Sequence, residues 1–244
     1  MREPVGSSLE GPAGLLGFRP IAGLRTSDGR RVIDGALYRS ATPQFVAAAD
    51  ARHFVERTGL RQIVDLRLDY EAAAEGSGGF SATEVAILNI PFAIRAPVAE
   101  GSAVAPMPGA DPLVATYLGY LGACDAFRAL IDALLDRDGL PAMVHCTMGK
   151  DRTGVAVAMV LDSIGVLRRD ICRNYAQRSE DIPAMMGRLR EMASYGDAVD
   201  VYPPEAMQMD PATVLRFLAW MDLRHNGTRQ WLASCLLYTS DAAD

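Results

Sequence analysis

Short apolar stretches separated by polar and turn residues dominate the first part of the chain. Three of them have the length and the boundaries of buried strands: Ala36 to Tyr38, Gln62 to Leu66 and Glu84 to Pro91. Between the first two lies QFVAAADARHFVERTG, residues 44–59, whose apolar spacing and terminal Gly59 are typical of a helix that stops at a glycine. This alternation of strands and helix predicts an α/β fold.

The second part of the chain has mostly helical spacing. Apolar residues recur at that spacing through residues 114–139, which predicts one long helix. PAMVHC, residues 141–146, is predicted to be a short strand, and RTGVAVAMVLDSIG, residues 152–165, a helix that is buried because its centre is apolar on every face. From Leu167 to about Ala233 we expect further helices, with a break at VYPPE, residues 201–205.

Three segments fall outside these elements. Residues 1–17 are rich in Gly, Pro and Ser and are expected to form a flexible amino-terminal arm, and residues 93–112 a long loop of the kind that often acts as a lid. Residues 235–244, CLLYTSDAAD, do not continue the preceding amphipathic pattern and look like a translated sequencing adaptor, so we expect them to be non-native. The folded domain is therefore expected to span residues 18–233.

Composition and charge narrow the class of protein. The chain has 244 residues, half of them hydrophobic, which is enough for one sizeable core. We expect a single α/β domain with a central, mainly parallel sheet flanked by helices. The net charge of -6 disfavours non-specific binding to nucleic acid and a general attraction to anionic membranes. Any anion-binding site must therefore be local.

The same survey predicts location and cofactors. The chain has no apolar run that suits a signal peptide and none of the ~20 residues that cross a bilayer, so we expect a soluble protein in the cytoplasm. Four scattered cysteines do not suggest a disulfide framework. With three histidines a zinc site is not expected either. We expect no metal or organic cofactor, and the pattern does not indicate an oligomeric state.

The stretch VHCTMGKDRTG, residues 144–154, carries the candidate chemistry. It lies between the predicted strand and the buried helix, where backbone N–H groups at a helix N-terminus converge on an anion. Five residues separate Cys146 from Arg152, enough chain to wrap the intervening amides around one phosphoryl group. Arg152 can hold two of its oxygens in a bidentate pair, and Gly149 lets the backbone turn tightly. The stretch therefore predicts a phosphate-binding loop.

Cys146 is the candidate nucleophile of this loop. The amides, the helix dipole and Arg152 all favour a thiolate, which attacks phosphorus to give a phosphocysteine that water then hydrolyses. Thr153 is placed to donate a hydrogen bond to the sulfur and ease its departure. His145 precedes the nucleophile on a strand and points away from the substrate, so we expect its ring to organise the loop by binding loop carbonyls.

The leaving oxygen needs a proton from a general acid, usually a carboxyl group. Asp151 lies in the loop itself, and Asp65 ends a predicted strand at the sheet edge where ligands bind. These two are preferred. A third candidate, Asp111, precedes a predicted helix and equally suits its N-cap. Lys150 either pairs with Asp151 or contacts a second phosphate of the substrate.

These residues resemble a known signature. HCTMGKDRTG, residues 145–154, matches the pattern His-Cys-x5-Arg-[Ser/Thr] of the cysteine-dependent protein tyrosine phosphatase superfamily, and its Lys-Asp pair narrows the likeness to atypical bacterial tyrosine phosphatases of the HCxxGKDRTG type. GLRTSDGRRVIDGALYRSATP, residues 23–43, and IVDLRLDYE, residues 63–71, are similar to two further motifs of that family. GFRPIAG, residues 17–23, matches the family's amino-terminal turn in part.

The resemblance implies a tyrosine phosphatase-like fold and hydrolysis of phosphotyrosine, and in some members of phosphoserine, phosphothreonine or phosphoinositides. The expected partner is therefore a phosphorylated protein or a phosphoinositide. Together with the loop chemistry, this makes Cys146 and Arg152 the expected catalytic residues, with Asp151 or Asp65 as the acid. The residues expected to contact the phosphorylated substrate are Thr147, Met148, Gly149, Lys150 and Thr153.

Two alternatives stay open. A sulfurtransferase of the rhodanese kind also uses a loop cysteine, but the spacing to Arg152 and the Arg-Thr pair favour phosphate over sulfane sulfur. A non-enzymatic phosphate-binding module descended from a phosphatase would usually have lost the nucleophile or the arginine, and this chain has both.

Overall fold

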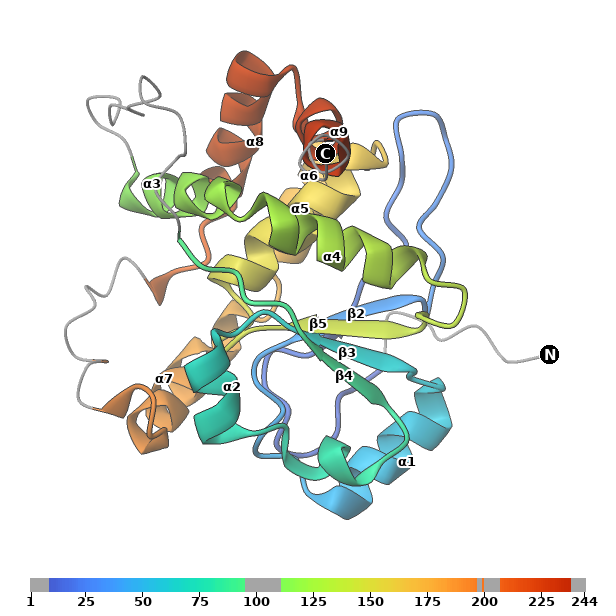
Figure 1. Cartoon of the computed structure of the whole chain (residues 1–244), viewed down its shortest axis with the longest axis vertical. Coiled ribbons are helices and arrows are strands. Elements are labelled where there is room, and N and C mark those ends of the chain that lie inside the picture. The colour runs from blue at the N-terminus through green and yellow to red at the C-terminus, as the bar shows by residue number, and fades with distance from the viewer. Residues whose placement is uncertain (1–8, 95–110, 197–198, 200–206, 238–244) are drawn as a thin grey trace, which may run out of the picture.

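A central sheet with helices on both faces forms the protein (Figure 1). The computed structural model describes residues 9–94, 111–196, 199 and 207–237. Within these residues the sheet has the strand order β1-β2-β5-β3-β4, and only β1 runs antiparallel to its neighbour. The expected mainly parallel sheet is therefore confirmed. The strands are β1 (Arg19–Pro20), β2 (Leu37–Ser40), β3 (Gln62–Asp65), β4 (Ala86–Asn89) and β5 (Ala142–His145).

Strand β5 lies at the centre of the sheet, and its position fixes where the candidate loop begins. His145, its last residue, is in register with Ser40 of β2 and Asp65 of β3. All residues of these three strands are buried. Parallel strands end at a common edge, so the chain leaves β5 at Cys146 between the ends of two buried neighbours.

The strands divide the core into two clusters, because successive side chains point to opposite faces. Ile63 and Met143 face a cluster that includes Phe54 of α1 (Ala48–Thr58). Val64 and Val144 face a larger cluster that includes α5 (Asp151–Ser163). Figure 1 shows these two helices on opposite sides of the sheet.

Helix α5 is buried at the centre of the larger cluster, as its sequence predicts. Residues 153–159 are all buried. The helix contacts β5, α6 (Arg168–Ala176), α8 (Pro211–His225) and α9 (Thr228–Leu237). The helix that follows the candidate loop is therefore held from several sides.

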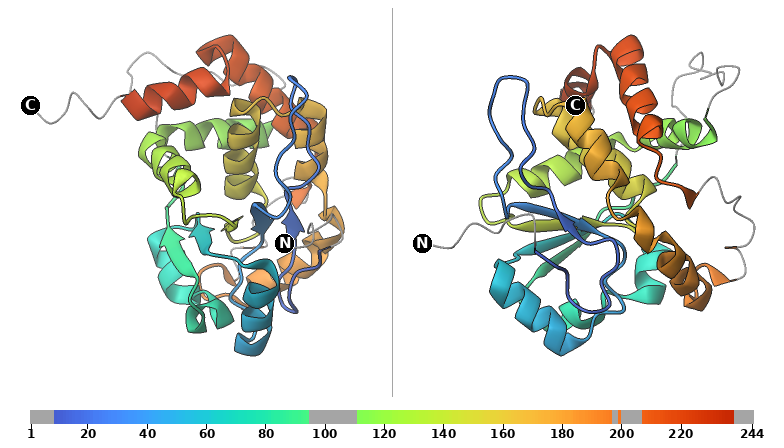
Figure 2. Two further views of the ribbon diagram at one scale, coloured as in Figure 1. Left: turned by 90° about the vertical axis from the view of Figure 1, so that its right-hand side faces the viewer. Right: turned by 180° about the vertical axis from the view of Figure 1, so that it is seen from behind.

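Helices α2 (Asp69–Glu75) and α7 (Ile182–Glu191) lie near each other at the carboxyl edge of the sheet (Figures 1 and 2). Ser194, just after α7, donates its backbone N–H and its hydroxyl to Glu75 at the end of α2, both at 2.8 Å. These segments bound one side of the candidate loop.

The predicted long helix over residues 114–139 is wrong. The chain forms α3 (Pro112–Gly119), a short 3-10 turn at Tyr120–Gly122 and α4 (Cys124–Leu135). Two glycines with weak helix propensity stand at the break, and the two halves pack against different partners: α3 against α8, and α4 against α9. Two more 3-10 turns occupy Gly78–Ala82 and Ser179–Asp181.

Two expectations about the sheet also need correction. Residues 84–91 were expected to form a buried strand, but β4 is an edge strand in which Ala86, Leu88 and Asn89 are exposed. An apolar run does not tell a central strand from an edge strand, because pairing beyond it depends on the rest of the fold. Strand β1 and helix α2 were not predicted.

The amino-terminal arm is packed where the structure describes it. Leu15 is buried in the cluster beneath α1, and the carbonyl of Gly14 accepts a hydrogen bond from Arg188 of α7. The expected flexible arm is therefore wrong for residues 9–17. Residues 1–8, most of the predicted lid at 93–112 and the predicted break at 201–205 lie outside the described residues.

The predicted carboxy-terminal boundary is also displaced. Helix α9 continues to Leu237, and Cys235 is buried and bonded to Cys124 at the start of α4. The scattered cysteines suggested no disulfide framework, and this single bond was not predicted. The pairing joins positions 111 residues apart, and sequence spacing alone does not show such a contact. Residues 238–244 lie outside the described residues.

None of the described helices combines the length and apolar character needed to cross a membrane. The cytoplasmic location expected from the sequence stays a prediction.

A buried ion pair between Arg67 and Asp65 lies at the end of β3. Arg67 donates to Asp65 with Nη2 at 2.6 Å from Oδ2, and the two side chains are 0% and 2% exposed. Arg67 also donates to the carbonyl of Gly76 at 2.8 Å and to the hydroxyl of Thr42 at 3.2 Å. The pair therefore ties β3 to the segments that follow β2 and α2.

Replacing Arg67 with methionine is expected to lower the free energy of unfolding by about 3–5 kcal/mol, because Asp65 would stay buried without its cation. Urea denaturation measures this change. The matched control is Arg61→Met, which breaks the exposed Arg61–Asp138 pair and should cost less than about 1 kcal/mol. Equal losses in the two variants would contradict the structural role of the buried pair.

Candidate active site

The candidate loop, residues 146–150, connects β5 to α5 at the carboxyl edge of the sheet. Gly149 adopts φ +64°, and an added Cβ would lie 2.1 Å from the carbonyl oxygen of Ser40. Only glycine fits this position without moving the backbone. The predicted tight turn at Gly149 is confirmed.

The backbone N–H groups of the loop are open to an anion. Among the described residues, no carbonyl or side chain accepts a hydrogen bond from the N–H groups of Thr147, Met148, Gly149, Asp151 and Arg152. The loop carbonyls, by contrast, are held from behind: Thr147 O accepts from Thr42 N at 2.9 Å and Gly149 O from Arg39 Nη2 at 2.8 Å. This pairing leaves the amides as an anion-binding cradle at a helix N-terminus.

Arg39 lies buried beneath the loop. Burial lowers its pKa to about 10, so it remains a cation at neutral pH. It also donates to Oδ1 of Asn174 in α6 at 3.3 Å. Arg39 belongs to the Leu-Tyr-Arg-Ser part of the motif at residues 23–43, and its support of the loop was not predicted from that motif.

Arg152 is fixed by a carboxylate that sequence reasoning missed. Its Nη1 and Nη2 atoms lie 2.5 and 2.9 Å from Oε2 and Oε1 of Glu71, a bidentate pair. Glu71 is 1% exposed and also accepts from the hydroxyls of Thr147 at 2.9 Å and Tyr195 at 2.5 Å. Glu71 is the last residue of the motif IVDLRLDYE, so this motif could have indicated that the glutamate belongs to the site. Tyr195 lies in no recognised motif.

This pair is ionised. Burial alone would raise the pKa of Glu71, but the hydrogen bonds and charge of Arg152, with the hydroxyl of Tyr195, lower it to about 2. Burial likewise opposes the charge of Arg152, but its bonds to Glu71 raise its pKa above the ordinary value. Arg152 is thus a permanent cation held in one orientation before substrate arrives.

Cys146 lies in a cavity of about 610 Å³ at this edge of the sheet. Among its described lining residues Arg152 is the single cationic side chain. Most of the wall is apolar or aromatic. The wall is formed by Leu68, Tyr70, Phe92, Ala93, Ile94, Leu113, Tyr120, Met148, Leu189 and Met207, and the other polar residues are Glu71, Thr116, Thr147, Asp151 and Tyr195.

Of the three candidate acids, the structure brings Asp151 into the cavity with Cys146. Its Oδ1 accepts from Lys150 Nζ at 2.7 Å and from the hydroxyl of Tyr117 at 2.9 Å. Within the described residues its Oδ2 has no hydrogen-bond partner. Lys150 is 1% exposed and does not line the cavity, so of the two roles considered for it the structure shows the pairing with Asp151.

The other two aspartates lie elsewhere. Asp65 is 1% exposed, does not line the cavity, and has both oxygens bonded to Arg67. Asp111 is the N-cap of α3 and accepts from the backbone N–H of Leu113 at 3.0 Å. This placement speaks against the preference for Asp65, because both of its oxygens are bonded to Arg67 and it does not line the cavity that holds Cys146.

Two neighbours of the loop behave differently from each other. The ring of His145 is fully buried, and its Nδ1 lies 3.0 Å from the carbonyl oxygen of Cys146. Burial lowers the pKa of the ring, so the histidine is neutral at neutral pH. It contacts a loop carbonyl, as the sequence predicted. Thr153 is also buried, but its hydroxyl has no partner among the described residues. Its expected hydrogen bond to the sulfur of Cys146 is not formed in this structure.

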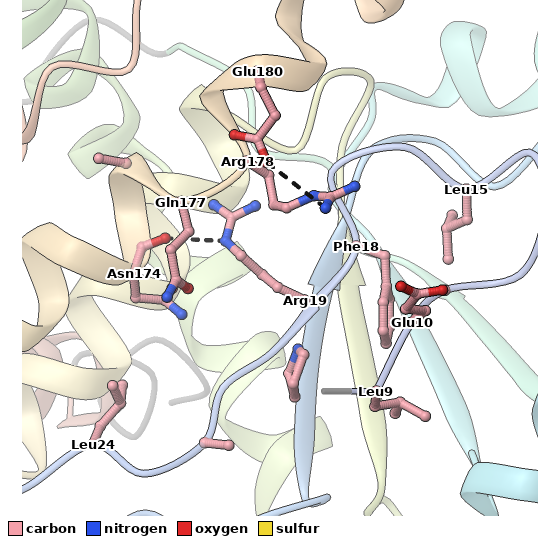
Figure 3. Close-up of a pocket in the computed structure, with 14 residues that line it drawn as sticks. Leu9, Glu10, Leu15, Phe18, Arg19, Leu24, Asn174, Gln177, Arg178 and Glu180 are labelled. Atoms are coloured by element: carbon pink, nitrogen blue, oxygen red, sulfur yellow. Dashed lines mark hydrogen bonds and ion pairs between the residues drawn. The ribbon is translucent and has the colours of Figure 1, made fainter. Parts of the chain in front are cut away.

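A second cavity, of about 800 Å³, lies between residues 9–24 and the carboxyl end of α6 with the segment that follows it (Figure 3). Arg19 enters it and donates from Nε to the carbonyl of Asn174 at 3.0 Å, a contact drawn in the figure. The guanidinium also donates to the carbonyls of Gly17 and Tyr175. It thus satisfies carbonyl groups in the last turn of α6. The described lining contains no cysteine, serine, threonine or histidine, so the candidate chemistry belongs to the smaller cavity that holds Cys146.

Within the described residues no group of histidine, cysteine and acidic side chains is arranged to hold a metal ion.

The chain is similar in sequence to known phosphatases. The sequence profile of the tyrosine phosphatase family matches residues 13–244. A protein of Cupriavidus necator, named as a candidate tyrosine-protein phosphatase, is 29% identical over 86% of this chain and 89% of its own length. The triple specificity protein phosphatase PtpB of Mycobacterium tuberculosis is 41% identical over 22% of this chain and 20% of its own.

Among solved structures, the catalytic domain of the PP-IP phosphatase Siw14 of S. cerevisiae covers 89% of this chain and 98% of its own, at 13% identity and a TM-score of 0.40. The structure of TpbA of P. aeruginosa covers 75% of this chain and 89% of its own, at 19% identity and a TM-score of 0.35. The family match spans nearly the whole chain and includes the loop of Cys146 and Arg152. The chain belongs to the tyrosine phosphatase family, whose members are cysteine-dependent phosphoric monoester hydrolases.

Proposed function

We propose that the protein hydrolyses aryl phosphomonoesters such as phosphotyrosine, with Cys146 as nucleophile and Asp151 as general acid. The observation that carries this proposal is the meeting, in one cavity, of Cys146, the pre-oriented Arg152 and Asp151. Thr147, Met148 and Asp151, whose backbone N–H groups have no acceptor among the described residues, line the same cavity.

The reaction has two steps. Cys146 Sγ attacks phosphorus and the P–O bond to the leaving group breaks, while Asp151 gives its proton to the departing oxygen. Water then attacks phosphorus, the P–S bond breaks, and Asp151 takes up the proton of the water. In both steps the loop amides and Arg152 hold the three non-bridging oxygens, whose charge they stabilise without reorganising.

The cavity wall supports an aryl leaving group. A polyphosphorylated inositol needs several cations to replace its hydration, and the described lining offers Arg152 alone. An aromatic ring instead gains contact with apolar and aromatic side chains. The mycobacterial protein is named for triple specificity and the yeast protein for PP-IP. A test of the aryl preference therefore needs a phosphoserine peptide and an inositol polyphosphate beside the phosphotyrosine peptide.

The two other functions considered receive less support. A sulfurtransferase is disfavoured by the family match, and a non-enzymatic binding module by the retention of nucleophile, arginine and acid in one cavity.

Leaving-group dependence tests the two main residues. Cys146→Ser should abolish phosphate release from every substrate. Asp151→Asn should lower kcat/KM for phenyl phosphate at least about 100-fold but for nitrophenyl phosphate much less, because a nitrophenolate departs without a proton. Wild-type turnover by Cys146→Ser, or equal losses on both esters in Asp151→Asn, would refute the assignments.

A substrate panel tests the aryl preference. Phosphate release from a phosphotyrosine peptide should exceed that from the phosphoserine peptide of the same sequence and from an inositol polyphosphate by about tenfold or more in kcat/KM. Leu113→Ala, which shortens the cavity wall, should reduce the value for phosphotyrosine about three- to tenfold through lost apolar contact of ~1 kcal/mol. The control is Leu215→Ala at an exposed position on α8. A preference for the inositol ester would contradict the proposal.

The ionisation of Glu71 predicts a pH dependence of stability. Its folded-state pKa of about 2 lies below the ordinary value of 4.5, so its contribution is fully present above about pH 4.5 and is lost as the pH falls towards 2. Urea denaturation should therefore show wild type more stable than Glu71→Gln by roughly 3 kcal/mol at pH 7, with the difference shrinking between pH 4.5 and 2. The exposed Glu84→Gln is the control. A difference that grows on acidification would contradict the assigned ion pair.

A further inference from the structure

The carboxylate of Asp151 is oriented by a residue far outside the loop. Tyr117, in α3, lies 34 positions earlier in the chain and donates its hydroxyl to Oδ1 of Asp151 at 2.9 Å. The tyrosine is fully buried, whereas the side chain of Asp151 is 32% exposed. The contact therefore joins a rigid interior group to a group at the cavity surface.

The ring of Tyr117 is locked by two other helices. Its centroid lies 6.4 Å from that of Tyr175 in α6 and 6.2 Å from that of Phe217 in α8, both in edge-to-face geometry. The hydroxyls of Tyr117 and Tyr175 are 2.5 Å apart. Three helices from separate parts of the chain thus set the position of one hydroxyl group.

The helix that carries Tyr117 is itself anchored. Asp111 caps the N-terminus of α3, and its Oδ2 accepts from the hydroxyl of Thr213 at 2.5 Å and from Arg216 at 3.2 Å, both on α8. The aspartate that the sequence offered as a third candidate acid therefore holds the start of this helix.

These contacts decide which oxygen of Asp151 can carry a proton. Oδ1 accepts from two donors, Tyr117 and Lys150, so its lone pairs are occupied. Burial, and after it the charge of Asp151, raises the pKa of Tyr117 well above its ordinary value, so the phenol remains a donor at neutral pH. The exchangeable proton of Asp151 is thereby confined to Oδ2.

We propose that Tyr117 is a positioning residue for the general acid, which holds Oδ1 and presents the proton on Oδ2 to the leaving oxygen. The inference rests on the proposed role of Asp151. In the first step the proton passes from Oδ2 to the leaving oxygen as the P–O bond breaks, and in the second step Oδ2 takes a proton from water. Tyr117 transfers no proton itself and supplies geometry alone.

The test compares leaving groups, because loss of a merely structural hydroxyl lowers all rates alike. Tyr117→Phe in the full chain should reduce kcat/KM for phenyl phosphate about tenfold or more and for nitrophenyl phosphate less than about twofold. In Asp151→Asn the same change should add almost nothing, since both substitutions remove one function. Tyr175→Phe, one hydrogen bond further away, should show the same selectivity with a smaller loss.

Tyr38→Phe is the matched control, because Tyr38 is an equally buried tyrosine in the cluster on the other face of the sheet. It should leave the ratio of the two substrates at the wild-type value. If Asp151→Asn is selective for the poor leaving group but neither Tyr117→Phe nor Tyr175→Phe is, the positioning role is wrong and the acid assignment stands. If Asp151→Asn shows no selectivity, the acid assignment fails and the inference fails with it.

Discussion

Within the described residues, the backbone N–H groups of Thr147, Met148, Gly149, Asp151 and Arg152 have no acceptor at the carboxyl edge of the buried sheet. N–H groups without a partner in the protein do not help to hold the loop, so other contacts must fix its conformation. The central position of β5, the left-handed turn at Gly149 and the bond from Arg39 to the loop carbonyl supply those contacts. The result is a site whose affinity for an anion is built in before the anion binds.

The charged groups around the loop are paired, and each pairing has a separate consequence. Glu71 fixes Arg152 and keeps it a cation, so in the proposed reaction the phosphoryl oxygens meet a guanidinium already in place. Arg67 encloses Asp65, so this pair stabilises the end of β3 and takes no part in the cavity. Lys150 and Tyr117 hold one oxygen of Asp151 and leave the other for the proposed proton transfer. Burial with a full complement of donors thus distinguishes Asp65 from Asp151, the proposed general acid.

Much of the fold followed from local patterns. The parallel strands, α1, α5 and the loop between β5 and α5 were predicted because apolar periodicity, glycine stops and the Cys146–Arg152 spacing are short-range features. The errors share a different cause. The split between α3 and α4, the exposed edge at β4 and the bond between Cys124 and Cys235 depend on which elements pack together, and no local pattern contains that information.

The sequence by itself was enough to propose the nucleophile, the arginine and the phosphate-binding loop, because these groups lie within seven consecutive residues and their spacing limits how the loop can fold. Only the tertiary structure distinguishes the three candidate acids and supports the proposal of Asp151, since Asp65, Asp111 and Asp151 differ in what the fold places around them. The same holds for Glu71, Tyr195 and Tyr117, which reach the loop from positions tens of residues away. Contacts of this range arise when helices pack against the sheet, and that packing is a property of the whole chain.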